Sequence, residues 1–442
     1  MNTDSILVIG GGLAGCEAAF AAAEQGVPVR LLEMKPDRYT PAHRSPLLGE
    51  LVCSNSLKAK RLGSAAGLLK EEMRRMGSLC VPVADDCAVP AGGALAVDRD
   101  RFAEEVTRRI AGHPLITVER GEAASLPSRG IAVVATGPLT AEPLAADIRR
   151  LCGGALSFYD AAAPIVEADS VDAERSFCAS RYDREESGQG DYINCPMNKE
   201  EYEAFHAALV SAERAPLHDF DQPDDRQVYE GCMPIEILAS RGLDAIRFGP
   251  MKPVGLRDPR TGHRPWAVLQ LRRENAAGSL LNLVGFQTNL TFPEQKRVFG
   301  LIPALHDAVY ARYGVMHRNT FIDSPRVLRP DYALKARPDL FFAGQITGVE
   351  GYMESAMAGI LAGQNAVRRL KGREPLILPR TTMMGALTAY ISDGTVADFQ
   401  PMGANFGILP PLPDKIRDKR QRYEALAGRA LDELSPYQIG KG

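Results

Sequence analysis

The sequence predicts an α/β protein: a Rossmann-like nucleotide-binding fold with an inserted α+β domain. Three features predict this class: a glycine-rich turn between an apolar strand and a helix at the N-terminus, a second such unit near residue 340, and short strands between them. The length of 442 residues corresponds to two or three domains. We expect a first part of the nucleotide-binding domain at 1–165, an inserted substrate domain at 166–318, and the second part with a C-terminal helix at 319–442.

The N-terminal unit is a strand over 5–9, a glycine turn over 10–15, and an Ala-rich helix that ends near Gly26. A second strand ends in Glu33, 18 residues beyond Gly15. In such a unit the glycines permit the tight turn, the approach of a pyrophosphate and the packing of helix on strand, while the acid accepts hydrogen bonds from a ribose. The glycine pattern alone is weak, but its position between strand and helix with an acid at this spacing is specific. The candidate nucleotide-binding residues are Gly10, Gly11, Gly12, Leu13, Ala14, Gly15 and Glu33.

Further elements follow from apolar periodicity and turn residues. A helix is expected with Leu62, Ala66, Leu69, Met73 and Met76 on one face. Residues 131–137 read as a buried strand ending in a small-residue turn, which would let the chain pass close to a cofactor.

A second strand-turn-helix unit is expected over 340–367. Its glycine loop contains the candidates Gly344, Gln345 and Gly351. The loop either directs backbone N–H groups at a bound nucleotide or is an ordinary connection between strand and helix.

The stretch between these units has a different character. Asn198 and Glu201 form a capping-box pattern at the start of a helix that places Tyr202, Phe205 and Leu209 on one face. From about 226 to 292 short apolar runs alternate with turn signals. This pattern predicts the inserted α+β domain.

Composition limits the function classes. With 45% hydrophobic and 24% charged residues the chain is globular, which excludes disordered and fibrous proteins. The eight cysteines form no C-x-x-C pair, so we expect reduced thiols rather than a disulfide scaffold, and we expect no metal. The start of the chain lacks a signal-peptide pattern, and no run is long enough to cross a bilayer. We therefore expect a soluble, cytoplasmic protein without membrane contact.

The formal net charge of −3 argues against a constitutive, sequence-blind nucleic-acid coat but leaves room for a local basic face. The densest basic runs are 368–373 and 415–422. Each either contacts RNA or is a solvated helix face.

Eight blocks of sequence identify a family. They are GELVCSNSLK (49–58), GLLKEEMRRMGSL (67–79), VPAGGALAVDRDRF (89–102), DYINCPMNKEEY (191–202), YEGCMPIE (229–236), RFGPMKPVGL (247–256), YGVMHRNTFI (313–322) and FFAGQITGVEGYMESA (341–356). The chain resembles, over essentially its whole length, the TrmFO family of bacterial folate- and FAD-dependent tRNA (uracil-5-)-methyltransferases. The resemblance implies a Rossmann-like FAD-binding fold of the glutathione-reductase type, with 5,10-methylenetetrahydrofolate as carbon donor. It further implies NADH or NADPH as reductant and the T-loop uridine at position fifty-four of tRNA as substrate.

The resemblance also assigns site residues. Uracil C5 is a poor nucleophile until a thiolate adds at C6, so a catalytic cysteine is expected. Within the family blocks this role falls to Cys232, with Cys53 as a second functional thiol in proton or carbon transfer. The other six cysteines are expected to be core or surface thiols. The blocks at 247–256 and 285–289 offer Arg247, Lys252 and Asn289 for folate or substrate contacts, or as solvated charges and strand caps.

The glycine fingerprint occurs once and is assigned to FAD. NADH or NADPH is therefore expected to bind only transiently, as a visiting reductant without a Rossmann unit of its own. Gln345 stands where flavoproteins commonly carry an acid, so it cannot supply that charge to the cofactor. Three alternatives stay open. Two of them are a flavin oxidoreductase acting on a small metabolite and a related wobble-uridine tRNA-modifying flavoprotein, which is longer. A catalytically silent flavin-containing RNA-binding protein is a third. No obligatory protein partner is inferred.

Overall fold

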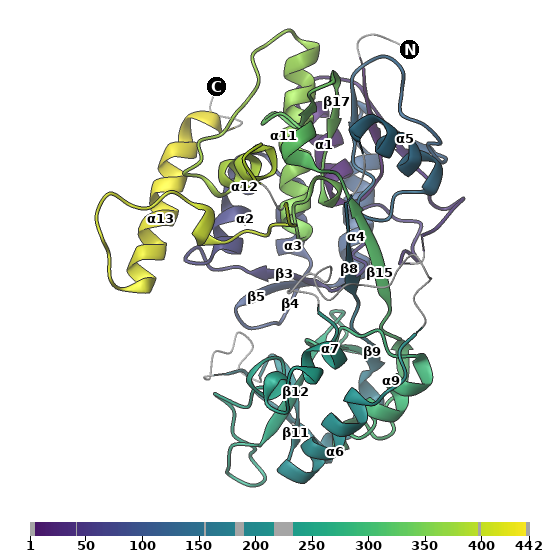
Figure 1. Cartoon of the computed structure of the whole chain (residues 1–442), viewed down its shortest axis with the longest axis vertical. Helices are drawn as coiled ribbons and strands as arrows, with labels where there is room; N and C mark the ends of the chain where they lie inside the picture. The colour runs from purple at the N-terminus through teal and green to yellow at the C-terminus, as the bar shows by residue number, and fades with distance from the viewer. Residues whose placement is uncertain are drawn as a thin grey trace.

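The computed structural model contains two lobes, each built on its own six-stranded sheet, with a pair of strands between them (Figure 1). The structure describes residues 5–40, 42–153, 156–181, 190–215, 233–396 and 399–438. The upper lobe holds both ends of the chain, and the lower lobe is formed by its middle third (Figure 1). The middle third of the chain is therefore an insertion into the upper lobe, and it forms the lower lobe.

The sheet of the upper lobe is parallel except at one edge, where β16 and β17 are antiparallel. Its strands in spatial order are β16 (Ala333–Leu334), β17 (Arg337–Phe342), β7 (Ala132–Val134), β1 (Ile6–Ile9), β2 (Val29–Glu33) and β6 (Ile116–Arg120). The central strands are short apolar runs, as expected for a sheet covered on both faces. Strand β17 comes from residues some 330 positions beyond β1 yet lies two strands away from it, so the distant segments expected to flank one nucleotide do meet.

Helices α1 (Leu13–Ala23) and α11 (Tyr352–Leu370) pack closely beside this sheet (Figure 1). Their contact is made of small residues: a Cβ at Gly359 would overlap the carbonyl of Ala14, and a Cβ at Gly363 would lie 2.5 Å from the carbonyl oxygen of Ala18. Because the two helix backbones touch, the start of α1 and the loop before α11 are held at a fixed separation.

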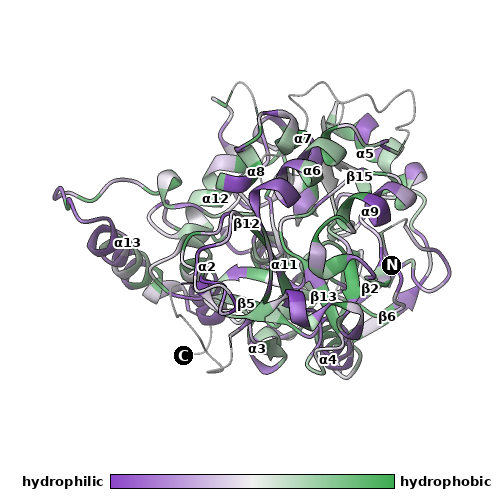
Figure 2. Cartoon of the chain, turned by 90° about the horizontal axis from the view of Figure 1, so that it is seen from below, coloured by the Kyte–Doolittle hydropathy of each residue, from purple (hydrophilic) through white to green (hydrophobic). Residues whose placement is uncertain are grey.

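The remaining elements of the upper lobe surround this centre. They are α2 (Ala65–Arg75), α3 (Cys80–Asp86), α4 (Arg99–Ala111), α5 (Glu142–Cys152), α12 (Met383–Ser392), α13 (Lys419–Leu434) and a small sheet of β3 (Ser56–Ala59), β5 (Ala94–Val97) and β4 (Ala88–Val89). Helix α13 stands at the margin of the lobe, and its ribbon carries both hydrophilic and hydrophobic residues (Figure 2). Its Leu426, Ala427 and Leu431 are buried against the lobe.

One part of the helix prediction is wrong. Ala66, Leu69, Met73 and Met76 are buried as expected, but Leu62 is 44% exposed and precedes the helix. Ser64 caps α2 by accepting the N–H of Gly67, so the helix begins after it and Leu62 lies outside the helix.

The lower lobe is built on an antiparallel sheet. Its strands in spatial order are β10 (Phe177–Cys178), β11 (Tyr192–Met197), β12 (Ala267–Arg273), β13 (Leu280–Leu283), β9 (Ile165–Glu167) and β14 (Tyr310–Arg312). The helices α6 (Lys199–Val210), α7 (Ile235–Ser240), α8 (Ala245–Phe248) and α9 (Phe292–Phe299) complete the lobe. The capping box at the start of α6 is confirmed, because Asn198 and Glu201 each accept the other's backbone N–H at 2.8 Å.

Phe205, Phe286 and Phe299 form the aromatic centre of the lower core, with ring centroids 6.0 and 5.3 Å apart. Between the lobes, β8 (Leu156–Ala161) pairs antiparallel with β15 (Met316–Phe321). All strands of the lower sheet fall within 165–312, and the bounds 1–165, 166–318 and 319–442 stay a prediction. Across the described ranges, no helix combines the length and apolar character that crossing a membrane requires.

Candidate functional site

Two positions in the turn at the end of β1 require glycine because of contacts within the protein itself. Gly10 has φ +103°, and a Cβ there would lie 2.5 Å from the carbonyl oxygen of Ala135. A Cβ at Gly15 would overlap the carbonyl of Gly10. Gly12, the N-cap of α1, is different because a Cβ there would meet nothing within 4 Å. The protein itself does not require a glycine at 12, but a ligand approaching the helix N-terminus does.

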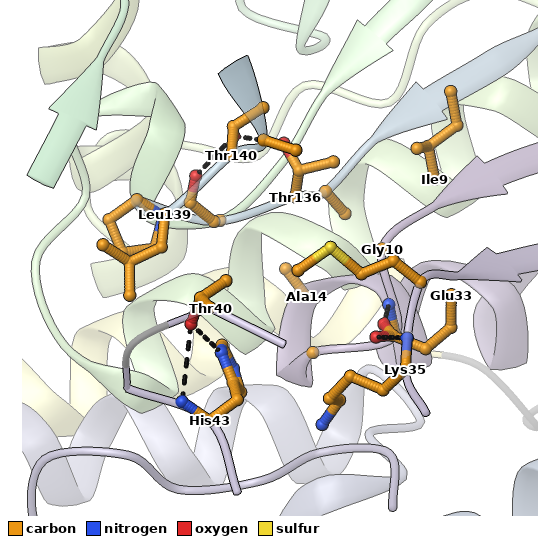
Figure 3. A pocket seen from close by; sticks show the side chains of 18 of the residues that line it. Ile9, Gly10, Ala14, Glu33, Lys35, Thr40, His43, Thr136, Leu139 and Thr140 are labelled. Atoms are coloured by element: carbon orange, nitrogen blue, oxygen red, sulfur yellow. Dashed lines mark hydrogen bonds between the residues drawn. The ribbon is translucent and has the colours of Figure 1, made fainter. Parts of the chain in front are cut away.

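Glu33, at the end of β2, is 6% exposed and reaches back to the turn. It accepts the N–H of Gly11 at 2.6 Å and the N–H of Lys35 at 3.0 Å (Figure 3). Each carboxylate oxygen can accept a second hydrogen bond, so Glu33 fixes the turn and still has acceptor capacity for a ligand hydroxyl.

A cleft that is partly open to solvent extends from this turn. Figure 3 shows Gly10, Ala14 and Glu33 on one side of it, with Thr136, Leu139 and Thr140 across from them. Of the candidates, Gly10, Gly11, Gly12, Leu13, Ala14, Glu33, Gly344 and Gln345 line the cleft. A cleft that begins at a glycine turn and a helix N-terminus suits a dinucleotide.

Two candidates do not line the cleft. Gly15 is buried under the turn, where it lets the helix approach the strand. Gly351 has φ +120°, and a Cβ there would overlap the carboxylate of Glu354, which forms an ion pair with Lys58 at 2.7 Å. These glycines shape the backbone on either side of the cleft.

The loop before α11 closes the other end of the cleft. Gly344 has φ +85°, and a Cβ there would lie 2.8 Å from the Cβ of Ala14. The side-chain amide of Gln345 donates to Glu350 at 2.6 Å. Gln345 therefore lines the cleft while its amide nitrogen is held from within the loop.

Several cleft residues were not singled out from the sequence. The turn after β7 lines it, as the small-residue pattern at 131–137 indicated. Thr40 and His43, whose side chains lie 2.6 Å apart, line it from the Pro-broken stretch after β2, where no periodic signal exists (Figure 3). Burial lowers the pKa of His43, so its imidazole is neutral near pH 7.

Cys53 lies at the rim of this cleft, in a segment whose neighbour Val52 lines it. The hydroxyl of Tyr352, another lining residue, accepts the N–H of Cys53 at 2.7 Å and that of Ser54 at 3.2 Å. Burial raises the pKa of Tyr352, so the hydroxyl stays neutral. The first residue of α11 thus fixes the backbone that carries the thiol.

Three arginines from three separate elements hold the same segment. Arg99 donates to the carbonyl of Leu51 at 2.8 Å, and Arg312 donates to that of Val52 at 2.7 Å. Arg272 donates to the hydroxyl of Ser54 at 2.9 Å.

The Cys53 side chain interacts electrostatically with all three arginines. One carboxylate, Glu274, pairs with Arg99 at 2.9 Å. The surroundings of Cys53 are therefore cationic and favour an anion there.

Cys232, the candidate nucleophile, lies outside the described residues. The chain just after it is firmly anchored: Ile235 donates its N–H to the carbonyl of Gln287 at 2.7 Å. Glu236 accepts from the hydroxyl of Thr288 at 2.9 Å and from the N–H of Asn289 at 2.8 Å. The other six cysteines are free thiols: Cys16, Cys80, Cys87, Cys152 and Cys195 are buried and Cys178 is exposed.

The other sequence candidates lie elsewhere. Arg247 stacks on Trp266 in the lower lobe, and Lys252 is exposed. Asn289 donates its side-chain amide to the carbonyl of Ala215 at 3.2 Å. None of these three residues lines the cleft.

The parallel sheet, the glycine turn and the cleft define a protein of the Rossmann-like FAD-binding fold class. The solved structure of Aquifex aeolicus GidA in its form II crystal has this architecture: its TM-score is 0.71 and it is 18% identical, covering 99% of this chain and 74% of that one. The family model described as GIDA, glucose inhibited division protein A, matches residues 5–374. The predicted fold class is confirmed.

Curated relatives narrow the family. A protein of Enterococcus faecalis is 55% identical over 431 residues, 97% of this chain and 98% of its own length. One from Moorella thermoacetica is 56% identical over 431 residues, 97% of each chain. Both are named methylenetetrahydrofolate–tRNA-(uracil-5-)-methyltransferase TrmFO. The chain belongs to the TrmFO family, which confirms the resemblance carried by the eight blocks.

Proposed function

We propose that the protein methylates C5 of the T-loop uridine at position fifty-four of tRNA, taking carbon from 5,10-methylenetetrahydrofolate and using reduced FAD as reductant. The names of relatives 53–56% identical to this chain support the transferase activity. The observation that carries the proposal is the Cys53 segment, held by Tyr352 at the rim of a dinucleotide cleft. Because the substrate is tRNA, the reaction belongs in the cytoplasm.

The described residues fit FAD. Gly12 leaves open space at the N-terminus of α1, where backbone N–H groups and the helix dipole favour a pyrophosphate. Glu33 has acceptor capacity for a ribose, and Gly344 and Gln345 line the same cleft. When bound, reduced FAD supplies the two electrons that bring a methylene-level carbon to a methyl group. NADH or NADPH would reduce it as a visiting substrate.

The chain's own task is to activate the uracil. The Cys232 thiolate adds to C6, and the C5–C6 π electrons move to the C4 carbonyl as an enolate. C5 then bonds to the methylene carbon as one of that carbon's bonds to a folate nitrogen breaks, and C5 loses its proton to a base. Loss of the second folate nitrogen leaves a methylene group at C5. Addition of two electrons and a proton to this methylene group, with expulsion of the Cys232 thiolate, gives the methyl group and restores the C5–C6 double bond. Cys53 acts in proton or carbon transfer, and the guanidiniums of Arg99, Arg272 and Arg312 stabilise an anion beside it.

The test is to incubate the FAD-loaded protein with unmodified tRNA, labelled methylenetetrahydrofolate and NADH or NADPH, and to analyse the nucleosides. Labelled 5-methyluridine at the T-loop position is expected, and omission of the folate should abolish it. Flavin turnover without transfer of label would favour an oxidoreductase acting on a small metabolite. Label at the wobble uridine would favour the activity of the related, longer flavoprotein.

A further inference from the structure

A second hollow lies on the lower lobe and shares no lining residue with the dinucleotide cleft. We call it the basic groove because its lining carries five cationic side chains and two carboxylates. The cations are Arg175, Lys199, Arg247, Arg260 and Arg264, and the carboxylates are Glu201 and Asp258. On a chain with a net charge of −3, this is a local reversal of sign.

Two aromatic rings accompany these cations. The guanidinium of Arg247 lies 3.9 Å from the ring centroid of Trp266, the one tryptophan in the sequence, and donates to its carbonyl at 3.0 Å. The same guanidinium lies 5.3 Å from the ring of Phe248, which is 70% exposed. An exposed ring beside a stacked arginine is a platform on which a nucleobase can stack.

The two carboxylates of the groove are already engaged. Asp258 accepts from the guanidinium of Arg260 at 3.0 and 2.6 Å, which lowers the pKa of Asp258. Glu201 is occupied in the capping box with Asn198. The Arg260 ion pair balances the charge of Asp258, which leaves Glu201 as the other carboxylate of the lining beside four further cations.

Three of the five cations are more available, whereas Arg260 pairs with Asp258 and Arg247 lies 3.4 Å from Asp244. Lys199 lies 3.8 Å from Glu203 and Arg175 lies 3.5 Å from Asp172, and such exposed pairs contribute little and exchange readily for phosphate. Arg264 is exposed, and among the described residues it makes neither a hydrogen bond nor an ion pair.

Strand β12 connects the groove to the thiol site. Trp266 directly precedes the strand, and Arg272, near its other end, donates to Ser54 beside Cys53. Six residues of extended chain span about 20 Å. A ligand that reaches both places must extend over that distance.

We propose that the basic groove binds the backbone and an unpaired base of tRNA while the target uridine lies near Cys53. The inference rests on the proposed function and adds the surface that holds the substrate. A polyglutamate tail of folate would match the charge, but it has no ring to stack on Phe248, so the aromatic platform favours RNA.

The experiment compares the affinity of an unmodified tRNA transcript for the FAD-loaded wild type, Arg264→Glu and Phe248→Ala over a series of salt concentrations. Arg264→Glu should weaken binding about tenfold and lower the slope of log K against log salt by about one, because one phosphate contact is lost. Phe248→Ala should weaken binding by about five- to a hundredfold with an unchanged slope. The rate of flavin reduction by NADH or NADPH should stay unchanged.

Lys296→Glu is the matched control: it reverses an exposed charge on α9 of the same lobe, outside the groove, and should leave tRNA affinity unchanged. Equal affinities for Arg264→Glu, Phe248→Ala and this control would overturn the inference. So would a raised KM for pentaglutamyl folate in Arg264→Glu with tRNA binding intact. If the wild type fails to bind tRNA, the proposed function fails together with the groove, whereas a wild type that binds alongside unaffected groove variants refutes the groove alone.

Discussion

The hydroxyl of Tyr352 accepts the backbone N–H of Cys53 at 2.7 Å across 299 residues of sequence. Tyr352 is the first residue of α11, whose backbone touches that of α1. The thiol segment is therefore tied to the helix pair that frames the cleft. The position of Cys53 relative to a bound nucleotide follows from helix packing rather than from the segment's own sequence.

Tyr352→Phe should release the Cys53 segment from α11 without loss of FAD from the cleft. The change leaves the N–H groups of Cys53 and Ser54 without their acceptor, a loss of about 1–3 kcal/mol. Methyl transfer should fall, while FAD content stays that of the wild type and alkylation of Cys53 becomes faster. Peptide mapping after timed alkylation measures the last point, with Tyr390→Phe, whose hydroxyl bonds the carbonyl of Gln400 instead, as control. An unchanged alkylation rate would show that the Tyr352 hydroxyl does not hold the Cys53 segment.

Gly12→Leu should abolish retention of FAD while the protein still folds, because a side chain at Gly12 meets no protein atom and would occupy the pyrophosphate approach. Gly15→Ala should instead lower the thermal stability of the apoprotein, since its Cβ overlaps the carbonyl of Gly10. Gly428→Leu is the control, because that glycine also has open space but lies on α13. Flavin absorbance after gel filtration and apoprotein melting are the measurements, and a yellow Gly12→Leu protein would remove FAD from this cleft.

The fold was predictable where the signal is local. The βαβ unit is predictable from the sequence because Gly15 is required by a contact with Gly10 inside the same turn. Gly10 also lies against Ala135 after β7, a contact that is distant in sequence. Leu62 was misplaced because its apolar period continues across the break at Ser64, where the helix begins. Boundaries depend on capping geometry, which periodicity does not report.

The thiol site was predictable only in part. The family blocks and thiol chemistry indicate Cys53, but Arg99, Arg272 and Arg312 carry no signal, since arginines are usually exposed. They come from a helix of the upper lobe and two strands of the lower sheet, and they meet at one segment only because the sheets bring them there. Long-range topology, which no spacing encodes, assembles this cluster.

Glu72 should make stability fall as pH rises. Burial raises its pKa from 4.5 to about 7, although it accepts the N–H groups of Met383 and Met384 at 2.8 Å. The folded state binds the extra proton between pH 4.5 and 7, so the free energy of unfolding decreases with rising pH over that window, by up to about 3 kcal/mol.

Glu72→Gln keeps one acceptor and cannot ionise, so urea unfolding at several pH values should show a flatter profile for the variant from pH 4.5 to 7. Parallel profiles would show that Glu72 does not titrate there.

The basic run 415–422, at the start of α13, is a second segment that we expect to contact tRNA. Lys415 and Arg417 are exposed before the helix, while Lys419 and Arg422 lie 5.5 and 5.6 Å from the ring of Tyr423. The double reversal Lys415→Glu with Arg417→Glu should weaken tRNA binding tenfold or more, on the order of one phosphate contact per charge, and leave flavin reduction unchanged. Affinity equal to that of the wild type would remove this segment from the RNA surface.

The two cysteines differ in what their loss should do to trapping by 5-fluorouridine. The analogue captures a C6 thioether because the C5 fluorine cannot leave as a proton does. Cys232→Ala should retain FAD and its reduction yet form no covalent complex with tRNA carrying the analogue at the target. Cys178→Ala, which removes an exposed thiol, is the control and should trap normally.

Cys53→Ala should stop turnover while some trapping through Cys232 persists, to the extent that addition precedes carbon transfer. The structure gives the reason: Cys53 is fixed by Tyr352 and three arginines at the rim of the cleft, a place suited to handling the carbon or proton. Gel-shift analysis of the denatured complexes measures trapping. Trapping by Cys232→Ala together with its loss in Cys53→Ala would reverse the two roles, and loss in both would mean that the thiols act as one unit.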